Sequence, residues 1–332
     1  MQNATSVYIA DFWKEHYLDT YIADGGSKIK FITGASGTGK TQMLDRVLAT
    51  ARDSGYVVAR ASAKKTWLHD FKEIYLTIFD AVDFDACLRV CADKIIENLG
   101  YRPDDIPAGM TFADYLMQKG DLDPITKREI RSNLSESFFS NTWIDNNFAI
   151  SSALMTSGIL GYPALEPTAK ELLLQWHRGQ KEARVAALRK LGLSPSRITK
   201  YNARHMLRSL IEIVRLAGYK GLVVGIDDLD ALSATSALEE IRYTKMRRED
   251  AYESIRELID SIDTLTHFMT VFAFDRDLIE DEIKGIKSYQ ALWMRIQNEI
   301  GGERVNKFAD IIYLNENEAD GQDAREEGND HV

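Results

Sequence analysis

The chain reads Gly34-Ala35-Ser36-Gly37-Thr38-Gly39-Lys40-Thr41, which matches the Gly-x4-Gly-Lys-Ser/Thr pattern of a phosphate-binding loop. An apolar segment at residues 29–32 predicts a strand before this loop, and a helical stretch begins near its last residue. The glycines leave room for successive backbone N–H groups to turn inward around an anion, and the helix adds its positive amino-terminal end. The sequence therefore predicts a binding site for a nucleoside triphosphate.

The last two residues of this loop carry the side chains that polyphosphate chemistry needs. The ammonium group of Lys40 is expected to reach the β- and γ-phosphate oxygens, and the Thr41 hydroxyl is placed to bind the accompanying Mg²⁺. The predicted nucleotide-binding residues are Gly34, Ala35, Ser36, Gly37, Thr38, Gly39, Lys40, Thr41 and Gln42.

A second acidic element is needed, because Mg²⁺ also takes a carboxylate and hydrolysis needs a group that orients water. The apolar run Leu222–Ile226 ends in Asp227 and Asp228. We interpret Asp227 as the magnesium carboxylate of a Walker B motif and Asp228 as the water-positioning base. Glutamate is commoner at the second position, and the shorter aspartate predicts slow or gated hydrolysis. The alternative is that both are turn-forming acids after a strand.

The periodicity predicts α/β units at both ends of the chain and helices between them. A helix around residues 11–21 precedes the first strand, and a second strand is expected at 56–60. One helix in the middle is expected to begin at the capping box Thr168-x-x-Glu171. Further strands are expected at Leu222–Asp227, 268–274 and 310–314.

The fold class is therefore a P-loop NTPase core with a parallel central sheet and a large helical insertion. Lys40 and Asp227 lie 187 positions apart, much further than a minimal core needs. The predicted divisions are an N-terminal helix and linker at 1–27, the core at 28–65 and 216–315, the helical insertion at 66–215, and a disordered acidic tail at 316–332.

Two further features are candidates for the catalytic site. The strand that ends near Phe274 is followed by Asp275, where P-loop ATPases with an additional strand place a polar sensor beside the γ-phosphate; a helix N-cap is the alternative. Arg248 and Arg256 follow the Walker B segment on one helix face. Either arginine is a candidate to stabilise transition-state charge across a subunit interface, and ion pairing within the chain is the alternative.

Charge is distributed unevenly along the chain. The net charge of -10 owes much to the tail from Glu316 onward, which holds seven acidic residues against a single arginine. The segment Arg178–Arg208 is instead strongly basic, and it suits DNA, an acidic partner or a neighbouring subunit's phosphates. The alternative is a solvated basic helix face. The uncharged stretch 148–165 contains too many Ser, Thr, Gly and Pro residues to span a bilayer, so we expect no membrane segment.

Several spaced patterns resemble the ATP-binding proteins of BREX-type bacterial phage-defence systems. The resemblance extends over roughly residues 28–315. Besides the phosphate loop, it rests on these patterns: Trp176-x-x-Gly179, Leu216-Ala217-Gly218-Tyr219-x-Gly221-Leu222 leading into Ile226-Asp227-Asp228, and Arg248-x3-Tyr252-x3-Arg256-x-Leu258-Ile259-Asp260. The chain departs from the pattern at Asp228, where glutamate is usual, and in the Ala-Phe-Asp ending of the strand before Asp275.

This resemblance implies a cytoplasmic ATPase of the additional-strand class, with ATP and Mg²⁺ as cofactors. It also implies other defence-system proteins as partners, and a homo-oligomer is possible within such a complex. Two classes of function then fit: a catalytic ATPase whose turnover remodels a partner or DNA, and a non-hydrolysing switch in which ATP holds an assembly together. A P-loop small-molecule kinase, with the inserted helices closing over an acceptor, is a third alternative.

Overall fold

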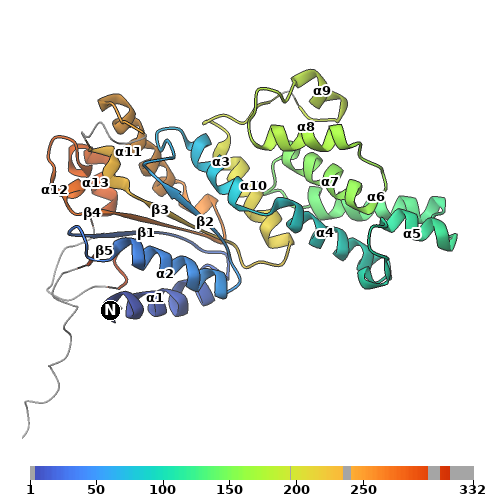
Figure 1. Ribbon diagram of the computed structural model, residues 1–332, viewed down its shortest axis with the longest axis horizontal. Helices are drawn as coiled ribbons and strands as arrows, with labels where there is room; N and C mark the ends of the chain where they lie inside the picture. Colours follow the sequence, from blue (N-terminus) through green and yellow to red (C-terminus); the bar gives the residue numbers. More distant parts are fainter. Residues whose placement is uncertain (1–3, 195, 235–240, 298–306, 315–332) are drawn as a thin grey trace, which may run out of the picture.

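A parallel five-stranded sheet forms the centre of the computed structural model, which describes residues 4–194, 196–234, 241–297 and 307–314 (Figure 1). Its strands are β1 (Ser27–Gly34), β2 (Val57–Ser62), β3 (Leu222–Asp227), β4 (Phe268–Asp275) and β5 (Ile311–Leu314). Their order in the sheet is β2-β3-β4-β1-β5, and every pairing is parallel. β4 therefore lies as an additional strand between β1 and β3. The predicted parallel α/β fold is confirmed.

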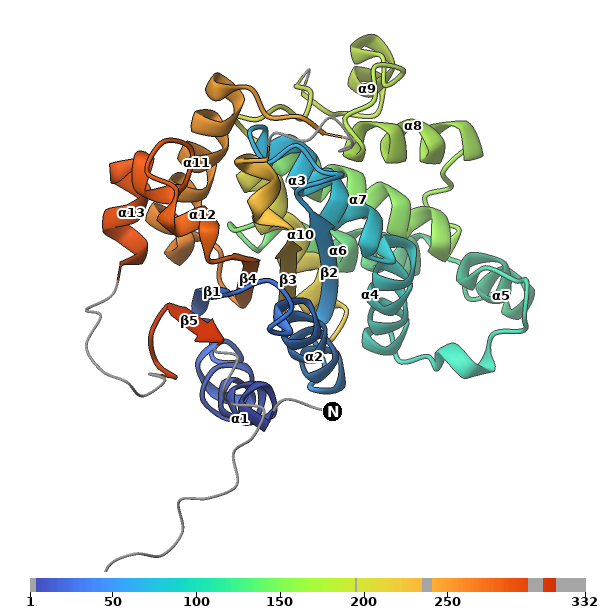
Figure 2. The same ribbon diagram turned by 60° about the vertical axis from the view of Figure 1, so that its left-hand side comes forward.

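The strands are apolar because both faces of the sheet are covered, as parallel sheets require. Neighbouring residues face opposite ways, so Phe31 joins the core on one face and Ile32 joins the core on the other. The face with Ile32 is covered by α1 (Ala4–Trp13), a π-helical segment (Lys14–Tyr21) and α2 (Lys40–Asp53). Figure 2 shows α1 and α2 on one side of the sheet and α3 and α10 on the other.

The helices between β2 and β3 share one hydrophobic core with the Phe31 face of the sheet. These helices are α3 (Phe71–Ala81), α4 (Phe84–Asn98), α5 (Phe112–Lys119), α6 (Pro124–Phe139), α7 (Asn146–Leu160), α8 (Pro167–His177), α9 (Val185–Lys190) and α10 (Ala203–Leu216), with a 3-10 turn at Pro103–Asp105. Because the core is continuous, the helical part packs on the sheet. The domain divisions at residues 66 and 216 stay a prediction.

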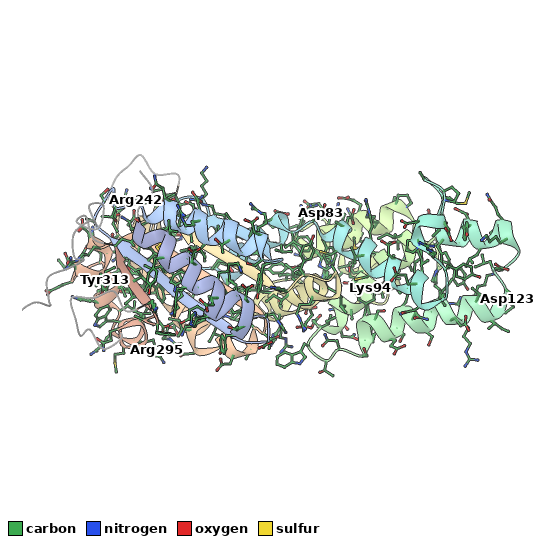
Figure 3. The ribbon with its side chains drawn as sticks, turned by 90° about the horizontal axis from the view of Figure 1, so that it is seen from below. Asp83, Lys94, Asp123, Arg242, Arg295 and Tyr313 are labelled. Atoms are coloured by element: carbon green, nitrogen blue, oxygen red, sulfur yellow. The ribbon has the colours of Figure 1, made fainter. Side chains whose placement is uncertain are left out.

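The segment after β3 builds the rest of the Phe31 face. It contains α11 (Lys245–Asp260), α12 (Asp277–Glu280) and α13 (Gln290–Ile296), with 3-10 turns at Leu229–Leu232, Ile262–Thr264 and Ile286–Ser288. The molecule is elongated: seen from below, Arg295 and Tyr313 lie toward one end and Asp123 lies at the other (Figure 3).

The stretch that lacks charge forms α7, whose small polar residues Ser151, Ser152 and Thr156 are buried against neighbouring helices. No helix in the described part of the chain is both long and apolar enough to cross a bilayer.

Three details differ from the sequence expectations. β2 runs two residues beyond the predicted end, to Ser62, and the first helix begins by residue 4. The capping box at Thr168 is wrong, because α8 starts at Pro167 with Glu166 as its N-cap and without a side-chain cap. Proline favours the first helical position, which moves the N-cap two residues earlier, from Thr168 to Glu166. The predicted acidic tail at 316–332 lies outside the described residues.

Candidate nucleotide site

The strand register brings the two halves of the predicted site to one edge of the sheet. Gly34 at the end of β1 pairs with Asp275 at the end of β4, and Asp227 at the end of β3 pairs with Ser62 of β2. All four strands run the same way, so their carboxyl ends lie at the same edge. The phosphate loop and both acidic segments therefore meet there, although the chain separates them by the whole helical part.

The loop has the backbone of an anion-binding turn. Gly37 and Gly39 adopt left-handed conformations with φ of 84° and 87°, which residues with a side chain rarely adopt. Gly39 is the N-cap residue of α2, so the free N–H groups of the first helical turn lie beside the loop. Thr38 closes the turn by donating its hydroxyl to the Ala35 carbonyl at 2.9 Å.

Lys40 is already engaged in this loop. Its ammonium group donates to the carbonyls of Ala35 at 2.6 Å and Gly34 at 3.3 Å, and it pairs with the Asp275 carboxylate at 2.6 Å. The side chain of Lys40 is 10% exposed. Asp275, the predicted sensor, is thus the acid that pairs with Lys40 at the phosphate loop.

Asp227 lies at the end of a fully buried strand and is 6% exposed. Arg60 of β2 donates to one carboxylate oxygen of Asp227 at 2.7 Å, and the backbone N–H of Asp228 donates to the other at 2.9 Å. Arg60 also pairs with Asp45 of α2.

Asp228 has a left-handed backbone with φ of 57°, a conformation that concentrates at functional sites. It accepts a hydrogen bond from the Ser62 hydroxyl at 2.6 Å and from the Lys64 ammonium at 3.0 Å. Burial alone would raise the pKa of Asp228, but these two partners outweigh it and hold that pKa below its ordinary value. Asp228 is therefore ionised at neutral pH and is oriented by the end of β2.

Asp230 is a further acid close to Asp275 and Lys64. It lies in the 3-10 turn Leu229–Leu232, and burial raises its pKa, with a further contribution from the negative charge of Asp275. The sequence prediction missed Arg60 and Ser62 on β2 and Lys64 two residues after it. One signal was available: they are polar residues at or just after the carboxyl end of a parallel strand.

The donor set suits Mg²⁺ held jointly by protein and phosphate. Thr41 and Asp45 are four residues apart on α2 and share a face of that helix. Because Arg60 pairs with both Asp45 and Asp227, the face of α2 that carries Thr41 and Asp45 lies beside the end of β3. Within the described ranges, no group of three or more His, Cys, Asp or Glu residues would hold a metal by itself.

The two candidate arginines lie at different places on α11. Arg256 is bound within the chain, because it donates to Glu253 at 2.7 Å and also pairs with Asp260. This bond lowers the pKa of Glu253 to about 2. The helix then leads to Ile262, whose carbonyl accepts from Ser27 at the start of β1. Arg256 therefore lies toward the edge of the sheet opposite the phosphate loop.

Arg248 lies about 12 Å nearer the start of the same helix, at 1.5 Å per residue. It is half-buried, and it faces Asp281 just after α12. The backbone N–H groups of Lys284 and Ile283 hold the pKa of Asp281 below its ordinary value, and Arg248 contributes its charge. Arg248 is thus on the same side of the molecule as the end of β4.

The basic segment 178–208 is partly engaged inside the molecule. Arg178 pairs with Asp80 at 3.1 Å, and Arg204 pairs with Glu257 at 2.5 Å. The residues around α9 are different, because their charged side chains are exposed: Arg184, Arg189 and Lys190. α9 lies on the outer side of the helical part (Figures 1 and 2).

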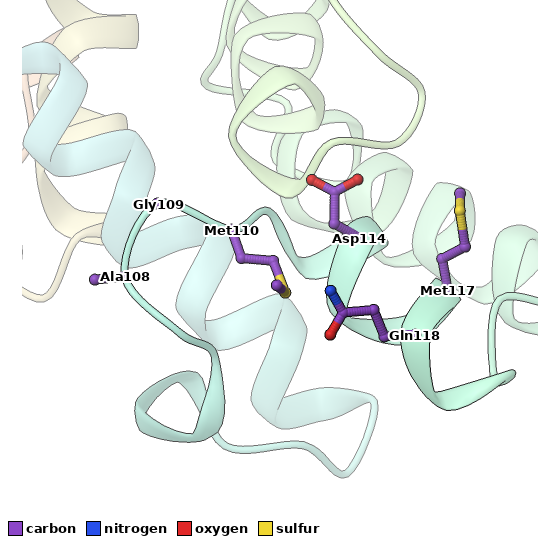
Figure 4. A pocket seen from close by; sticks show the side chains of 6 residues that line it. All are labelled: Ala108, Gly109, Met110, Asp114, Met117 and Gln118. Atoms are coloured by element: carbon purple, nitrogen blue, oxygen red, sulfur yellow. The ribbon is translucent and has the colours of Figure 1, made fainter.

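The helical part also carries a hollow of about 530 Å³ beside α5 (Figure 4). Its lining residues are Ala108, Gly109, Met110, Asp114, Met117 and Gln118. Asp114 is already bound to Thr111 in the capping box that starts α5. The hollow lies at the end of the molecule away from α12 and the strand ends, so it is not part of the nucleotide site (Figure 1).

Comparison with known proteins gives one family. The model of a family described as "BREX system ATP-binding protein BrxC/D" matches residues 15–320. No curated protein matches the chain.

Proposed function

This chain belongs to the BrxC/D family of BREX system ATP-binding proteins, and from that premise we propose that it binds and hydrolyses Mg²⁺-ATP in a phage-defence complex. One observation carries the proposal: the phosphate loop ending in Lys40 and the acids Asp227 and Asp228 meet at the same edge of the sheet. ATP binding and hydrolysis would be coupled to remodelling of a partner protein or DNA.

Each side chain has a role that follows from its position. Lys40 binds the β- and γ-phosphates, while Thr41 and Asp227 hold Mg²⁺, which neutralises charge on the phosphates when it is bound. Asp228, ionised and aligned by Ser62 and Lys64, orients the water that attacks the γ-phosphorus as the bond to ADP breaks. Asp275 responds to the γ-phosphate because both compete for Lys40.

Phosphate release tests the catalytic proposal directly. Lys40→Ala removes the phosphate contact and Asp228→Asn removes the base, so we expect both variants to lose Mg²⁺-dependent release of phosphate from ATP. The Asp228→Asn variant should still bind nucleotide, since the phosphate loop is intact. Unchanged release in both variants would rule out this site as the source of hydrolysis.

An ATP-gated assembly switch is the second candidate. It is favoured by the short Asp228 side chain, which Ser62 and Lys64 both hold. In that case wild-type protein binds ATP tightly and assembles with its partners, and turnover stays negligible when they are added. Robust hydrolysis stimulated by partners would exclude the switch. The kinase alternative has less support, since α4–α7 extend away from the strand ends where an acceptor would bind (Figure 1).

A homo-oligomer would give Arg248 a role at a neighbour's site. The test mixes two variants, Lys40→Ala and Arg248→Ala, each without hydrolysis alone. If Arg248 acts across an interface, some mixed interfaces combine an intact loop with an intact arginine, and hydrolysis is partly restored. Two inactive proteins that stay inactive on mixing would refute this role.

DNA binding is proposed for the exposed basic residues at α9. Reversing the charge of Arg184, Arg189 and Lys190 should then weaken DNA binding, and wild-type binding should fall steeply with salt as counterions are released. Binding that does not depend on salt, or no binding at low ionic strength, would refute this proposal.

A further inference from the structure

Arg60 joins two carboxylates that belong to different elements of the nucleotide site. Its guanidinium group pairs with Asp227 of β3 at 2.7 Å and with Asp45 of α2. The Arg60 side chain is 42% exposed, whereas the Asp227 side chain is 9% exposed. The buried acid thus shares a partly exposed cation with an acid on the surface.

The position of Arg60 follows from the sheet register. Arg60 pairs with Gly225, and Gly225 is on the same strand face as Asp227 two residues later. A side chain at Gly225 would meet Leu44 and Leu48, so this face is the one that α2 covers. The bridge from Arg60 therefore lies against α2, about one helical turn after Thr41.

Both oxygens of Asp227 are occupied by donors in this arrangement. The donor from Asp228 is a backbone N–H that is held by the chain itself. The donor from Arg60 is a flexible side chain that has a second acid, Asp45, available. A metal ion that binds Asp227 would therefore displace Arg60, because Arg60 is the donor that is free to leave.

We propose that Arg60 competes with Mg²⁺ for Asp227, and that Asp45 receives the guanidinium group when the metal binds. This inference rests on the proposed Mg²⁺-ATP function. Arg60 neutralises the buried acid in the metal-free protein. The Mg²⁺ concentration that the site needs therefore depends on whether the guanidinium group pairs with Asp227 or with Asp45. Arg60 is thus a residue that sets metal affinity and does not contact the phosphates.

The test measures how nucleotide binding depends on Mg²⁺, with a fluorescent N-methylanthraniloyl-ATP as the probe. Arg60→Ala should lower the Mg²⁺ concentration for half-maximal binding about two- to fivefold, since partly exposed ion pairs contribute modestly. Asp45→Asn should raise it, because the guanidinium group then has Asp227 as its remaining carboxylate partner. Affinity in EDTA should be unchanged in both. Arg52→Ala, on the last turn of α2, is the matched control, because it also removes one arginine charge.

Mn²⁺ titrated without nucleotide and followed by electron paramagnetic resonance gives a second readout. Arg60→Ala should bind Mn²⁺ more tightly than the wild type, and adding Asp227→Asn should abolish the gain. Equal Mn²⁺ affinity in wild type and Arg60→Ala, or loss of probe binding in EDTA in Arg60→Ala, would overturn the inference. Failure of the wild type to bind the probe would instead refute the proposed function, while the Mn²⁺ result would still decide the role of Arg60.

Discussion

Gly34 is the last residue of β1 and the first of the phosphate loop, so a single position serves the sheet and the site. A Cβ atom there would lie 2.5 Å from the Leu314 carbonyl oxygen and 2.6 Å from the Thr38 hydroxyl. The first contact is with backbone, which has little freedom to move because β5 pairs with β1. The loop therefore needs glycine at this position for packing as well as for anion binding.

Gly34→Ala should lower the free energy of unfolding by about 1–3 kcal/mol, the usual cost of overpacking. Nucleotide binding should weaken as well, because the loop has to shift away from β5. Urea denaturation and probe binding measure the two effects. Ser36→Ala, at an exposed loop position, should leave stability unchanged. A Gly34→Ala protein as stable as the wild type would contradict the contact argument.

His177 is a second residue whose surroundings set its behaviour. Its ring lies among the aromatic rings of Phe79, Phe84, Phe148 and Trp176, and its Nε2 atom is 2.9 Å from the Ser151 hydroxyl. Burial lowers the pKa of His177 to about 3. The folded protein thus keeps this imidazole neutral at a pH where the unfolded chain protonates it.

Stability should therefore fall as pH drops from 6.5 toward 3, because the unfolded state binds a proton that the folded state does not. For one such group the slope reaches about 1.4 kcal/mol per pH unit. His177→Phe should flatten the slope in urea unfolding between pH 7 and 5. Burial also lowers the pKa of His69 and His267, so a smaller slope remains. The exposed control His205→Gln should keep the wild-type slope; an equal slope in His177→Phe would contradict this account.

At the scale of elements, β5 is a short edge strand that depends on a buried lysine. Lys30 of β1 is fully buried and donates to the carbonyls of Phe308 at 2.9 Å and Ala309 at 2.7 Å. Burial lowers the pKa of Lys30 to about 8. These bonds fix the segment that enters β5, and β5 in turn contacts Gly34 of the phosphate loop.

Lys30→Met should cost about 1–3 kcal/mol of unfolding free energy, because two carbonyls lose a buried donor. Hydrogen exchange at residues 311–314 should accelerate, since the anchor of β5 is removed. Lys28→Met is a matched control, as Lys28 lies on the same strand and pairs with Asp310 at a partly exposed position. That change should cost less than about 1 kcal/mol. Equal costs for the two variants would refute the anchoring role.

Element ends show where sequence patterns stop being informative. The capping box predicts Thr168 as the N-cap of α8, but Pro167 occupies the first helical position and the N-cap is Glu166, two residues earlier. β2 extends to Ser62 because it pairs with β3 through Asp227, a neighbour far away in the sequence. Local propensity carries no information about pairing with a distant strand, so the predicted end of β2 is two residues short.

At the scale of the molecule, the sheet and the helical part share one core. That core runs from Phe31 and Phe272 on the sheet to Leu188 and Leu193 near α9. We therefore expect the described part of the chain to unfold as one cooperative unit. The proposed division into a core at 28–65 and 216–315 and an insertion at 66–215 would then describe the order of the chain, and the two parts would not unfold separately.

Thiol labelling tests this expectation. Cys87 and Cys91 on α4 are free and buried, and burial raises the pKa of Cys87 to about 12 and that of Cys91 to about 11. They should resist alkylation at pH 8 until the helical part opens. The urea midpoint for labelling should coincide with the midpoint for loss of circular dichroism, and a variant with both thiols changed to serine gives the baseline. Two separate midpoints would contradict a single unit.

Local patterns in the sequence were enough to predict the phosphate loop, the strand that ends in Asp227, the parallel α/β fold and the presence of inserted helices. Each of these rests on residues that are neighbours in the chain, so spacing and periodicity express them directly. The roles of Lys40, Thr41, Asp227, Asp228, Asp275 and the arginines remain predictions.

Partnerships between distant residues were decided by the tertiary structure alone. Lys40 pairs with Asp275, and Arg60 bridges Asp45 and Asp227. The chain offers 41 lysine and arginine residues and 51 aspartate and glutamate residues. Strand order and register select among these many equivalent pairs, and both arise from packing of the whole sheet, which no local stretch of sequence contains.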